Sequence, residues 1–201
     1  MPPHPSIISQ KVVRLHSEKY LVRTITTGDA SDRWASWMSN QEAMHMLNMP
    51  ARIWKKADVV NYIKTFDQRS HLLLGIFEKQ SGLHIGIFAV DINYALSQYL
   101  VNLLIGEPEY RNKGVTSSLM VRFRDYFFET LGLNTSKASV LAHNTAMIHY
   151  LIKTGWQLEQ TVTGSTKSHA TGEKLDICLF SLSREAWRDW KKKNLPSSNK
   201  A

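Results

Sequence analysis

The sequence of 201 residues is poor in cysteine, with Cys178 as its only one. A single cysteine excludes a disulfide within these residues and a cysteine-rich zinc site, and it fits a reducing compartment. Cys178 lies between apolar neighbours in the segment KLDICLFSL. We interpret it as a small residue of a buried strand, with a nucleophilic role as the alternative.

Long apolar runs and regular metal-ligand spacings are missing as well. No apolar stretch approaches the roughly 20 residues of a membrane-spanning helix, and the opening segment MPPHPSIISQ lacks the basic-then-apolar layout of a signal peptide. The eight histidines are scattered, without a His-Glu-x-x-His pattern. We therefore expect a cytoplasmic protein that has no membrane span and no metal.

Positive charge is in modest excess. The net charge is +8, and residues 184–201 contribute +4 of it. The +4 that remains for the body suits an anionic small ligand better than a polyanion. The C-terminal segment REAWRDWKKKNLPSSNKA favours a short helix whose two tryptophans pack on the body. Contact of these rings and lysines with nucleic acid is the alternative.

Apolar periodicity and turn residues divide the chain into strands and helices. Its 43% hydrophobic and 21% charged residues are typical of a globular protein. One or two short strands are predicted within residues 11–26, and further strands over residues 71–79, 83–92, 98–106, 137–143, 156–164 and 173–183. Helices are predicted over residues 30–40, capped by Asp29 or Ser31, and over residues 55–68, 115–128 and 144–155.

These elements indicate an α/β (α+β) fold. We predict a single domain over residues 11–190, with a mixed, mostly antiparallel central sheet and about four flanking helices. A flexible lead of residues 1–10 precedes this domain, and a basic polar tail of residues 191–201 follows it.

The stretch EPEYRNKGVTSSLMVRFRDYFF changes character at Gly114. Polar and charged residues precede this glycine. After it, Val115, Leu119, Phe123 and Phe127 recur every fourth residue, which is the spacing of one apolar helix face. A basic loop thus leads directly into a helix start, whose free N–H groups and partial positive charge attract an anion such as phosphate.

Two motifs resemble the GNAT N-acetyltransferase superfamily. The run Arg111-x-x-Gly114-x-Thr116 resembles the family's arginine/glutamine-x-x-glycine-x-glycine/alanine signature. The segment NTAMIHYLIKTGWQLE is similar to the family's asparagine-opened helix that ends in Lys-x-Gly-Phe, with Trp156 in place of the phenylalanine. The resemblance spans residues 11–190 and extends to the Rim-type branch, whose members acetylate ribosomal-protein termini, spermidine and amino sugars.

The resemblance implies a site for acetyl-coenzyme A. In the family, the turn and helix start hold the pyrophosphate, and N–H groups of the preceding strand bind the coenzyme arm and the thioester carbonyl. Carried over to this sequence, the coenzyme-binding residues are Leu104, Ile105, Gly106, Arg111, Asn112, Lys113, Gly114, Val115, Thr116 and Asn144. Thr116 and Asn112 depart from the family's small residues, but both side chains can hydrogen-bond a phosphate. Asn144 has the alternative of capping its own helix.

The implied reaction is direct attack of a primary amine on the thioester. The amine must lose a proton, and Glu107 is the candidate base because it directly follows the strand, with Asp91 as the alternative. Tyr150 is the candidate acid for the departing thiolate, with water as the alternative. The family's tyrosine position holds Leu151 here, and Tyr150 lies about 100° away round the helix.

Other polar residues have open assignments. His143 and His149 are further candidate proton carriers, and Asp176 is a candidate contact for a cationic substrate or a structural partner. The resemblance implies that the acceptor is the primary amine of a small molecule, an amino sugar or a protein N-terminus. Loops 38–54 and 161–172, which would line its pocket, match no recognition code, so the sequence does not choose among these acceptors. We expect a monomer or a homodimer. The rival functions are an acyltransferase with another acyl donor and a nucleic-acid-associated module that uses the basic tail.

Overall fold

The computed structural model describes residues 9–50 and 52–195, without the side chain of Met46. The predicted lead therefore lies almost entirely outside the described residues. The chain forms an eight-stranded sheet with the order β1-β2-β3-β4-β5-β6-β8-β7. Its strands are β1 (Arg14–His16), β2 (Tyr20–Thr24), β3 (His71–Glu78), β4 (His84–Asn93), β5 (Gln98–Ile105), β6 (Thr135–Leu141), β7 (Gln157–Lys167) and β8 (Lys174–Ser183).

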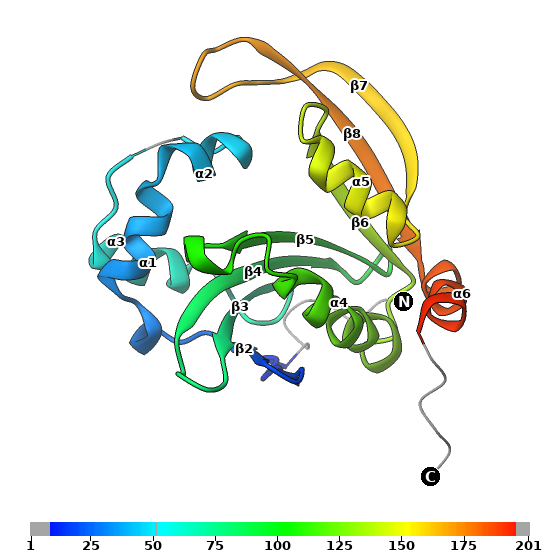
Figure 1. Ribbon diagram of the computed structural model, residues 1–201, viewed down its shortest axis with the longest axis horizontal. Coiled ribbons are helices and arrows are strands. Elements are labelled where there is room, and N and C mark those ends of the chain that lie inside the picture. The colour runs from blue at the N-terminus through cyan, green and yellow to red at the C-terminus, as the bar shows by residue number, and fades with distance from the viewer. Residues whose placement is uncertain (1–8, 51, 196–201) are drawn as a thin grey trace.

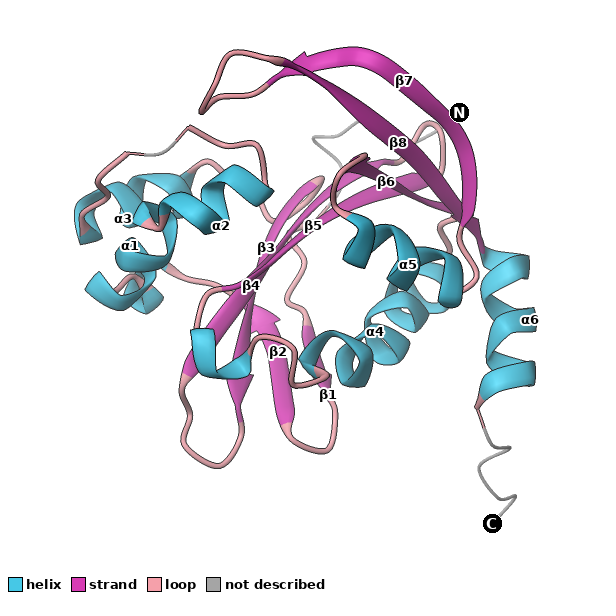
Figure 2. Cartoon of the chain, turned by 45° about the horizontal axis from the view of Figure 1, so that its top comes forward, coloured by secondary structure: helices cyan, strands magenta, loops and turns pink. Residues whose placement is uncertain are grey.

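The sheet divides between β5 and β6. All other neighbouring strands pair antiparallel, whereas β5 and β6 run parallel, which confirms the predicted mixed sheet. They pair only from Gln98↔Thr135 to Leu100↔Lys137 and then diverge. Figures 1 and 2 show the resulting opening between the two halves of the sheet. Beyond Leu100, the edge of β5 that faces β6 therefore has no strand partner among the described residues.

Helices cover both faces of the sheet. Within the described residues they are α1 (Asp32–Ser39), α2 (Gln41–Met46), α3 (Lys56–Lys64), α4 (Val115–Asp125), α5 (Thr145–Lys153) and α6 (Arg184–Asn194), and a π-helical segment (Tyr126–Thr130) extends α4. The first three gather at one side of the β1–β5 half, and α4 and α5 lie apart from them (Figure 1). None of the helices in the described ranges is long and apolar enough to cross a membrane.

The described residues form more helices than the four flanking helices that the sequence predicted. The additional helix α2 lies in a segment that the sequence predicted as a loop. Asn40 starts it, because its Oδ1 accepts a hydrogen bond from Ala43 N at 2.8 Å, and Met44 anchors it in the core. A helix of only six residues is too short to show helical periodicity, so the pattern misses such an element. The C-terminal helix α6 also runs past the predicted boundary at residue 190.

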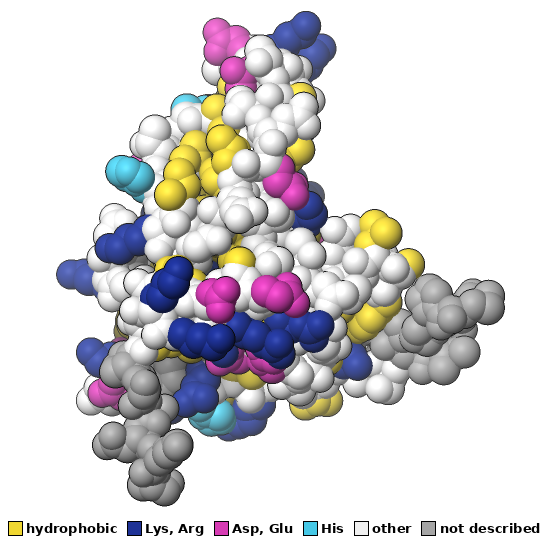
Figure 3. Space-filling view, turned by 90° about the vertical axis from the view of Figure 1, so that its right-hand side faces the viewer, with side chains coloured by type: hydrophobic (Ala, Val, Ile, Leu, Met, Phe, Trp, Pro, Cys, Tyr) yellow, Lys and Arg dark blue, Asp and Glu magenta, His cyan; other side chains and the backbone are white. Residues whose placement is uncertain are grey.

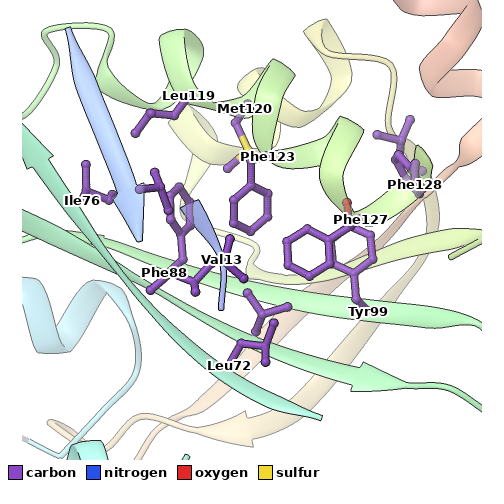
Figure 4. Packing of buried hydrophobic residues seen from close by; sticks show 14 of the residues in the cluster. Val13, Leu72, Ile76, Phe88, Tyr99, Leu119, Met120, Phe123, Phe127 and Phe128 are labelled. Atoms are coloured by element: carbon purple, nitrogen blue, oxygen red, sulfur yellow. The ribbon is translucent and has the colours of Figure 1, made fainter. Parts of the chain in front are cut away.

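The apolar face predicted for α4 is confirmed. Val115, Leu119, Phe123 and Phe127 are all at most 2% exposed. Figure 4 shows how Phe123 and Phe127 point from α4 toward the strands, where the ring of Tyr99 lies against Phe127. This packing fixes the start of α4 next to the end of β5.

A second cluster holds α1 and α3 on the opposite face. Ser31 caps α1, as predicted, by accepting a hydrogen bond from Trp34 N at 3.1 Å. Trp34 and Trp37 are buried against the ring of His84 on β4, with centroid separations of 5.1 and 5.0 Å. The apolar residues packed around α4 and those packed around α1 and α3 therefore cover opposite faces of β4 and β5.

Candidate active site

The turn before α4 has the shape of an anion-binding loop. Asn112 and Gly114 both adopt left-handed conformations, with φ of 58° and 74°. The first bond inside the helix runs from Ser118 N to Gly114 O at 3.0 Å, so the N–H groups of the helix's first turn, residues 115–117, have no helical acceptor. A Cβ added to Gly114 would meet no atom within 4 Å. The turn thus presents free N–H groups around open space.

The basic residues of this turn differ in what they contact. Arg111 is half-buried, and its guanidinium donates to the carbonyl oxygens of Ile105 and Gly106 at 3.1 and 3.0 Å. It therefore holds the end of β5 against the turn. Lys113 is exposed and makes no hydrogen bond within the described residues. Of the two cations, Lys113 has the freer head to meet an anion.

The register of β4 and β5 decides which N–H groups of β5 are free. Gly106 N donates to Ile85 O at 2.9 Å, so its N–H is already used. Hydrogen bonding alternates along an antiparallel ladder, and the pairing of β4 with β5 therefore directs the N–H of Leu104 toward β4 as well. The N–H groups of Leu103 and Ile105 face the opening instead. Of the predicted residues 104–106, only Ile105 therefore has an N–H group that faces the opening, and Leu103, just before that segment, has a second one.

A cleft lies in the opening between β5 and β6. Thr116 of α4 and Asn144 and Tyr150 of α5 line it together with the free edge of β5, so it brings several of the sequence-predicted residues to one place. Asn144 Oδ1 accepts a hydrogen bond from Met147 N at 3.1 Å and caps α5. Its amide nitrogen donates to no atom of the described residues, so one side chain can cap the helix and face the cleft.

Tyr150 enters the cleft from α5 despite its offset from the family's position. Its hydroxyl is buried and has no hydrogen-bond partner in the described part of the chain. Burial raises the pKa of Tyr150, and the nearby Arg124 cation acts in the opposite direction. Leu151 lines the same cleft. A protonated phenol therefore lies in the wall of the cleft.

Glu107 lies beside α1, outside this cleft. Its carboxylate accepts hydrogen bonds from Trp37 Nε1 at 2.8 Å and from Arg33 Nη1 at 3.2 Å, and the residue is 7% exposed. Gly106 permits this arrangement, because a Cβ there would lie 2.0 Å from the Trp37 ring. Glu107 thus ties the end of β5 to α1.

Asp91 lies toward the other end of the same sheet face. Its Oδ1 is 2.8 Å from His71 Nδ1, and its side chain is 47% exposed. Asp91 is two residues beyond Ala89, which lines a second hollow, whereas Glu107 lines a separate polar hollow with Arg33, Trp37 and Arg111.

The second hollow is largely apolar. It opens between the α1–α3 side and the strands β4 and β5, and it is lined by Met38, Leu47, Met49, Tyr62, Ile87, Ala89, Asn102, Leu103 and Leu104. Leu47, Asn102 and Leu103 also line the cleft, so the two spaces adjoin across β5. None of the residues lining the hollow is acidic. The sequence did not single out Asn102, although its place in a strand of apolar residues was a visible signal.

Hydrogen bonds of Asn48 join the segment after α2 to the β7–β8 hairpin. Asn48, in a left-handed conformation with φ of 48°, follows α2 and reaches the tip of the β7–β8 hairpin. Its Nδ2 donates to Lys167 O at 3.0 Å, and its Oδ1 accepts from His169 N at 3.1 Å. The segment after α2 is therefore bonded to the β7–β8 hairpin, in addition to the pairing of β5 with β6 at residues 98–100.

The remaining candidates lie away from the cleft or have other partners. His143 and His149 are exposed, and the ring of His143 stacks on His45 of α2 at 6.1 Å. Asp176 accepts a hydrogen bond from Gly164 N at 2.8 Å, which is a structural contact within the β7–β8 hairpin. Cys178 is buried in β8. No group of three or more potential ligand side chains among the described residues is arranged to hold a metal ion.

The C-terminal helix packs on the body. Trp187 is fully buried and donates through Nε1 to Asp125 Oδ1 at 2.9 Å, and Trp190 Nε1 donates to Lys153 O at 2.9 Å. Lys191 and Arg188 pair with acidic residues of the α4 region, Asp125 and Glu129. Figure 3 shows acidic side chains directly beside the basic ones on this face. The two tryptophans of this helix are thus packed on the body, as predicted.

Comparison with known proteins identifies the family and the fold. Residues 19–157, more than half of the chain, match the family described as Acetyltransferase (GNAT) domain. The chain belongs to the GNAT acetyltransferase family. It is an acetyl-coenzyme A-dependent N-acetyltransferase, and the predicted family is confirmed. A comparison with curated proteins gives no match.

Solved structures of GNAT enzymes are similar in fold. The acetyltransferase (GNAT family) from Bacillus anthracis has a TM-score of 0.74 at 16% sequence identity, and the match covers 86% of this chain and 99% of the Bacillus anthracis chain. Spermidine N-acetyltransferase from Vibrio cholerae, in complex with CoA and spermine, gives 0.74 at 19% identity, with coverage of 85% and 98%. Ribosomal-protein-S5-alanine acetyltransferase from Vibrio fischeri gives 0.71 at 18%, with coverage of 87% and 98%. At these identities, the likeness concerns the fold alone.

Proposed function

We propose that this GNAT enzyme transfers an acetyl group to the primary amine of a small molecule or a protein N-terminus by direct attack on the thioester. The observation that best supports this function is that three structural features lie around one cleft. The open turn at Gly114 lies at its start, the unpaired edge of β5 forms one wall, and the Tyr150 hydroxyl lies in the other. These features suit a phosphate, an amide-rich arm and a departing thiolate.

The residues present fit coenzyme A. Free N–H groups of the first turn of α4 bind the pyrophosphate, and the space above Gly114 admits it. N–H groups of Leu103 and Ile105 bind the arm and polarise the thioester carbonyl. Acetyl-coenzyme A, when bound, supplies an activated acyl group. The protein then contributes mainly the orientation of the two reactants.

The acceptor enters from the apolar hollow. This space adjoins the cleft at Leu103, so an amine held there reaches an acyl group bound along β5. Its lining lacks an acidic side chain. The hollow thus suits an amine attached to an apolar group better than a polycation such as spermine, because a polycation needs nearby carboxylates.

The Glu107 carboxylate is proposed as the base, with Asp91 as its competitor. We expect Glu107→Gln to slow turnover most at low pH, with coenzyme affinity nearly unchanged, because the amide cannot take up a proton. The measurement is a pH–rate profile of both Glu107→Gln and Asp91→Asn. A slower Asp91→Asn variant would assign the base to Asp91. Trp37→Phe is the control, since it removes one hydrogen bond to Glu107 and leaves the carboxylate.

The Tyr150 hydroxyl is proposed as the acid. We expect Tyr150→Phe to lower the turnover number by about 10²-fold, the low end for a positioned acid, with a Km for acetyl-coenzyme A near that of the wild type. The hydroxyl has no partner among the described residues, so its removal breaks no hydrogen bond. Steady-state kinetics and a thermal melt check both points. A loss below tenfold would assign proton donation to water.

The cations of the turn are expected to contribute in different ways. Lys113→Ala should weaken coenzyme binding by about 1–2 kcal/mol, the scale of a charge-assisted hydrogen bond at a wet site, and this loss should shrink as salt rises. Arg111→Ala should be salt-insensitive, because Arg111 holds the end of β5 through backbone carbonyls. Titration calorimetry at two salt concentrations distinguishes the two. Equal salt dependence would place both heads on the phosphates.

An amine panel tests the proposed acceptor class. The enzyme is incubated with acetyl-coenzyme A and one amine at a time, and free thiol and acetylated product are both measured. We expect apolar primary amines or peptides with an apolar first residue to exceed spermidine and amino sugars. A preference for spermidine would contradict the acceptor part of the proposal.

A further inference from the structure

The closed end of the cleft holds a cluster of polar groups that the acetyl reaction does not use. Tyr99 of β5 and Ser136 of β6 are direct register partners at the fork, and Arg124 reaches the same space from α4. All three residues are at most 3% exposed. They lie among apolar neighbours such as Phe123 and Met120. We call Tyr99, Ser136 and Arg124 the fork cluster.

The polar atoms of the fork cluster are poorly satisfied. Tyr99 Oη, Ser136 Oγ and Arg124 Nε are each buried, and none of them makes a hydrogen bond of ordinary geometry within the described residues, although the hydroxyls of Tyr99 and Ser136 lie close to each other. Buried polar atoms in native proteins are nearly always bonded, because an unbonded one has lost its hydration without compensation. Three such atoms at one end of one cleft indicate a group that bonds them together.

Arg124 determines the charge of that group. No carboxylate in the described part of the chain lies within salt-bridge distance of its guanidinium. Its contacts are a hydrogen bond to Thr154 Oγ1 at 3.2 Å, a long one to Thr154 O at 3.5 Å, and the rings of Trp156 and Trp187 at 5.6 and 5.0 Å. A buried cation needs an anion or a full set of acceptors, and these contacts supply only part of it.

The fork cluster lies where an acyl group would end. The free edge of β5 runs from the Gly114 turn back to the fork at Tyr99 and Leu100, and α4 runs beside it from Thr116 to Arg124. A coenzyme whose phosphates bind at the turn directs its thioester along this edge. An acyl chain longer than acetyl then extends toward Arg124, and Figure 4 shows Tyr99 rising from β5 at this position.

We propose that the fork cluster is a subsite for an acyl group that ends in a carboxylate, so that the enzyme also uses a dicarboxylic acyl-coenzyme A such as succinyl-coenzyme A. The carboxylate accepts hydrogen bonds from Arg124 Nε and the two hydroxyls. This inference rests on the proposed function of the same cleft, and it adds a class of acyl donor.

The chemistry is the same transfer with a different acyl group. The amine nitrogen bonds to the thioester carbon, the carbon–sulfur bond breaks, and coenzyme A leaves as a thiolate that takes up one proton. The amine loses one proton overall. The product is an amide that keeps its free carboxylate, so the transfer needs no oxidant and no further co-reactant.

Calorimetric titration tests the subsite without an acceptor. Wild-type protein is titrated with coenzyme A, acetyl-, butyryl- and succinyl-coenzyme A. Butyryl is the matched control, because it has the same four-carbon chain without the carboxylate. We expect succinyl-coenzyme A to bind at least about tenfold more tightly than butyryl-coenzyme A, as charge-assisted hydrogen bonds in a buried site imply. Equal affinity, or tighter binding of the butyryl form, would overturn the proposal.

Variants assign the effect to Arg124. Arg124→Met should bring the succinyl-to-butyryl affinity ratio close to one, whereas Arg122→Met, an exposed position on the same helix, should keep the wild-type ratio. Where Arg124→Met does not fold, Ser136→Ala replaces it and should lower the ratio about threefold. A ratio that survives in the folded variant would overturn the assignment.

Two controls distinguish the ways in which this inference can fail. Sodium succinate alone should give no heat at the same concentrations, because the subsite needs the coenzyme to direct the acyl group. If free succinate binds as well as the thioester, the cluster is a simple anion site and the proposal is wrong. Binding of acetyl-coenzyme A without a succinyl preference would overturn only this inference, whereas no binding of any coenzyme form would overturn the proposed function too.

Discussion

Gly114→Val should abolish detectable binding of acetyl-coenzyme A and leave the fold intact. Gly114 has φ of 74°, a conformation that a β-branched residue rarely adopts, so the turn itself should shift. The new side chain would also occupy the open space above the helix start. Together, backbone strain of about 1–3 kcal/mol and loss of the phosphate contacts predict at least a hundredfold weaker binding. Thermal stabilisation by the coenzyme measures the loss, because ligand binding to the native state raises the melting temperature.

Gly82→Val is the matched control for this prediction. Gly82 has φ of 71° and equally open surroundings, but it lies in the turn between β3 and β4. Both variants carry the same backbone strain, so both should melt below the wild type. Only Gly114→Val should lose the coenzyme-dependent rise in melting temperature. A normal rise in the Gly114 variant would place the phosphates elsewhere.

Stability should fall as the pH is lowered from 6.5 toward 4, because of His84. The ring of His84 stacks on Phe77 at 4.6 Å and lies against two tryptophans of α1, and its Nε2 is 3.0 Å from Gly86 O. Burial lowers its pKa from 6.5 to about 4. The folded state therefore binds fewer protons than the unfolded state in this window. The stability is fully present above pH 6.5 and is lost as the pH falls, by about 3 kcal/mol in total.

Urea unfolding between pH 8 and pH 5 checks this prediction. The lower limit stays above the ordinary pKa of Asp and Glu side chains, about 4, so that His84 accounts for most of the change. His84→Phe keeps an aromatic ring in the stack and should flatten the pH dependence. His149→Gln removes an exposed histidine and should leave the slope unchanged. A slope that persists in His84→Phe would assign the pH dependence to other groups.

His84 also connects stability to the site. Its ring contacts Trp37, whose indole N–H holds the carboxylate of Glu107. Protonation of His84 would therefore loosen α1 at the point where Glu107 is fixed. A loss of activity at acidic pH should accompany the loss of stability, and His84→Phe should lessen both.

Most helices and strands of this fold were predictable because each of them has its own local pattern. The apolar repeat after Gly114 predicted α4, and the strands around residues 71–106 follow from apolar runs separated by turn residues. The glycine turn before α4 was predictable for the same reason, since Gly114 and the helix start are adjacent in the sequence. Short elements without a pattern, such as α2, were not.

The cleft itself was not predictable in this way. It exists because β5 and β6 pair at Tyr99↔Ser136 and then diverge, and no local pattern reports the pairing of two residues so far apart in the sequence. The fork cluster is hidden for the same reason. Arg124 is the exception, because it lies four residues after Met120 on the buried side of α4, where a charged residue is unusual.

Hydrogen exchange with and without acetyl-coenzyme A tests the central claim most directly. If the coenzyme lies between the Gly114 turn and the free edge of β5, its binding should slow exchange in two segments at once, residues 101–105 and residues 112–117. The buried strand β3 serves as an internal reference and should not change. Protection confined to other segments, or no protection at saturating coenzyme, would contradict the site described for this enzyme.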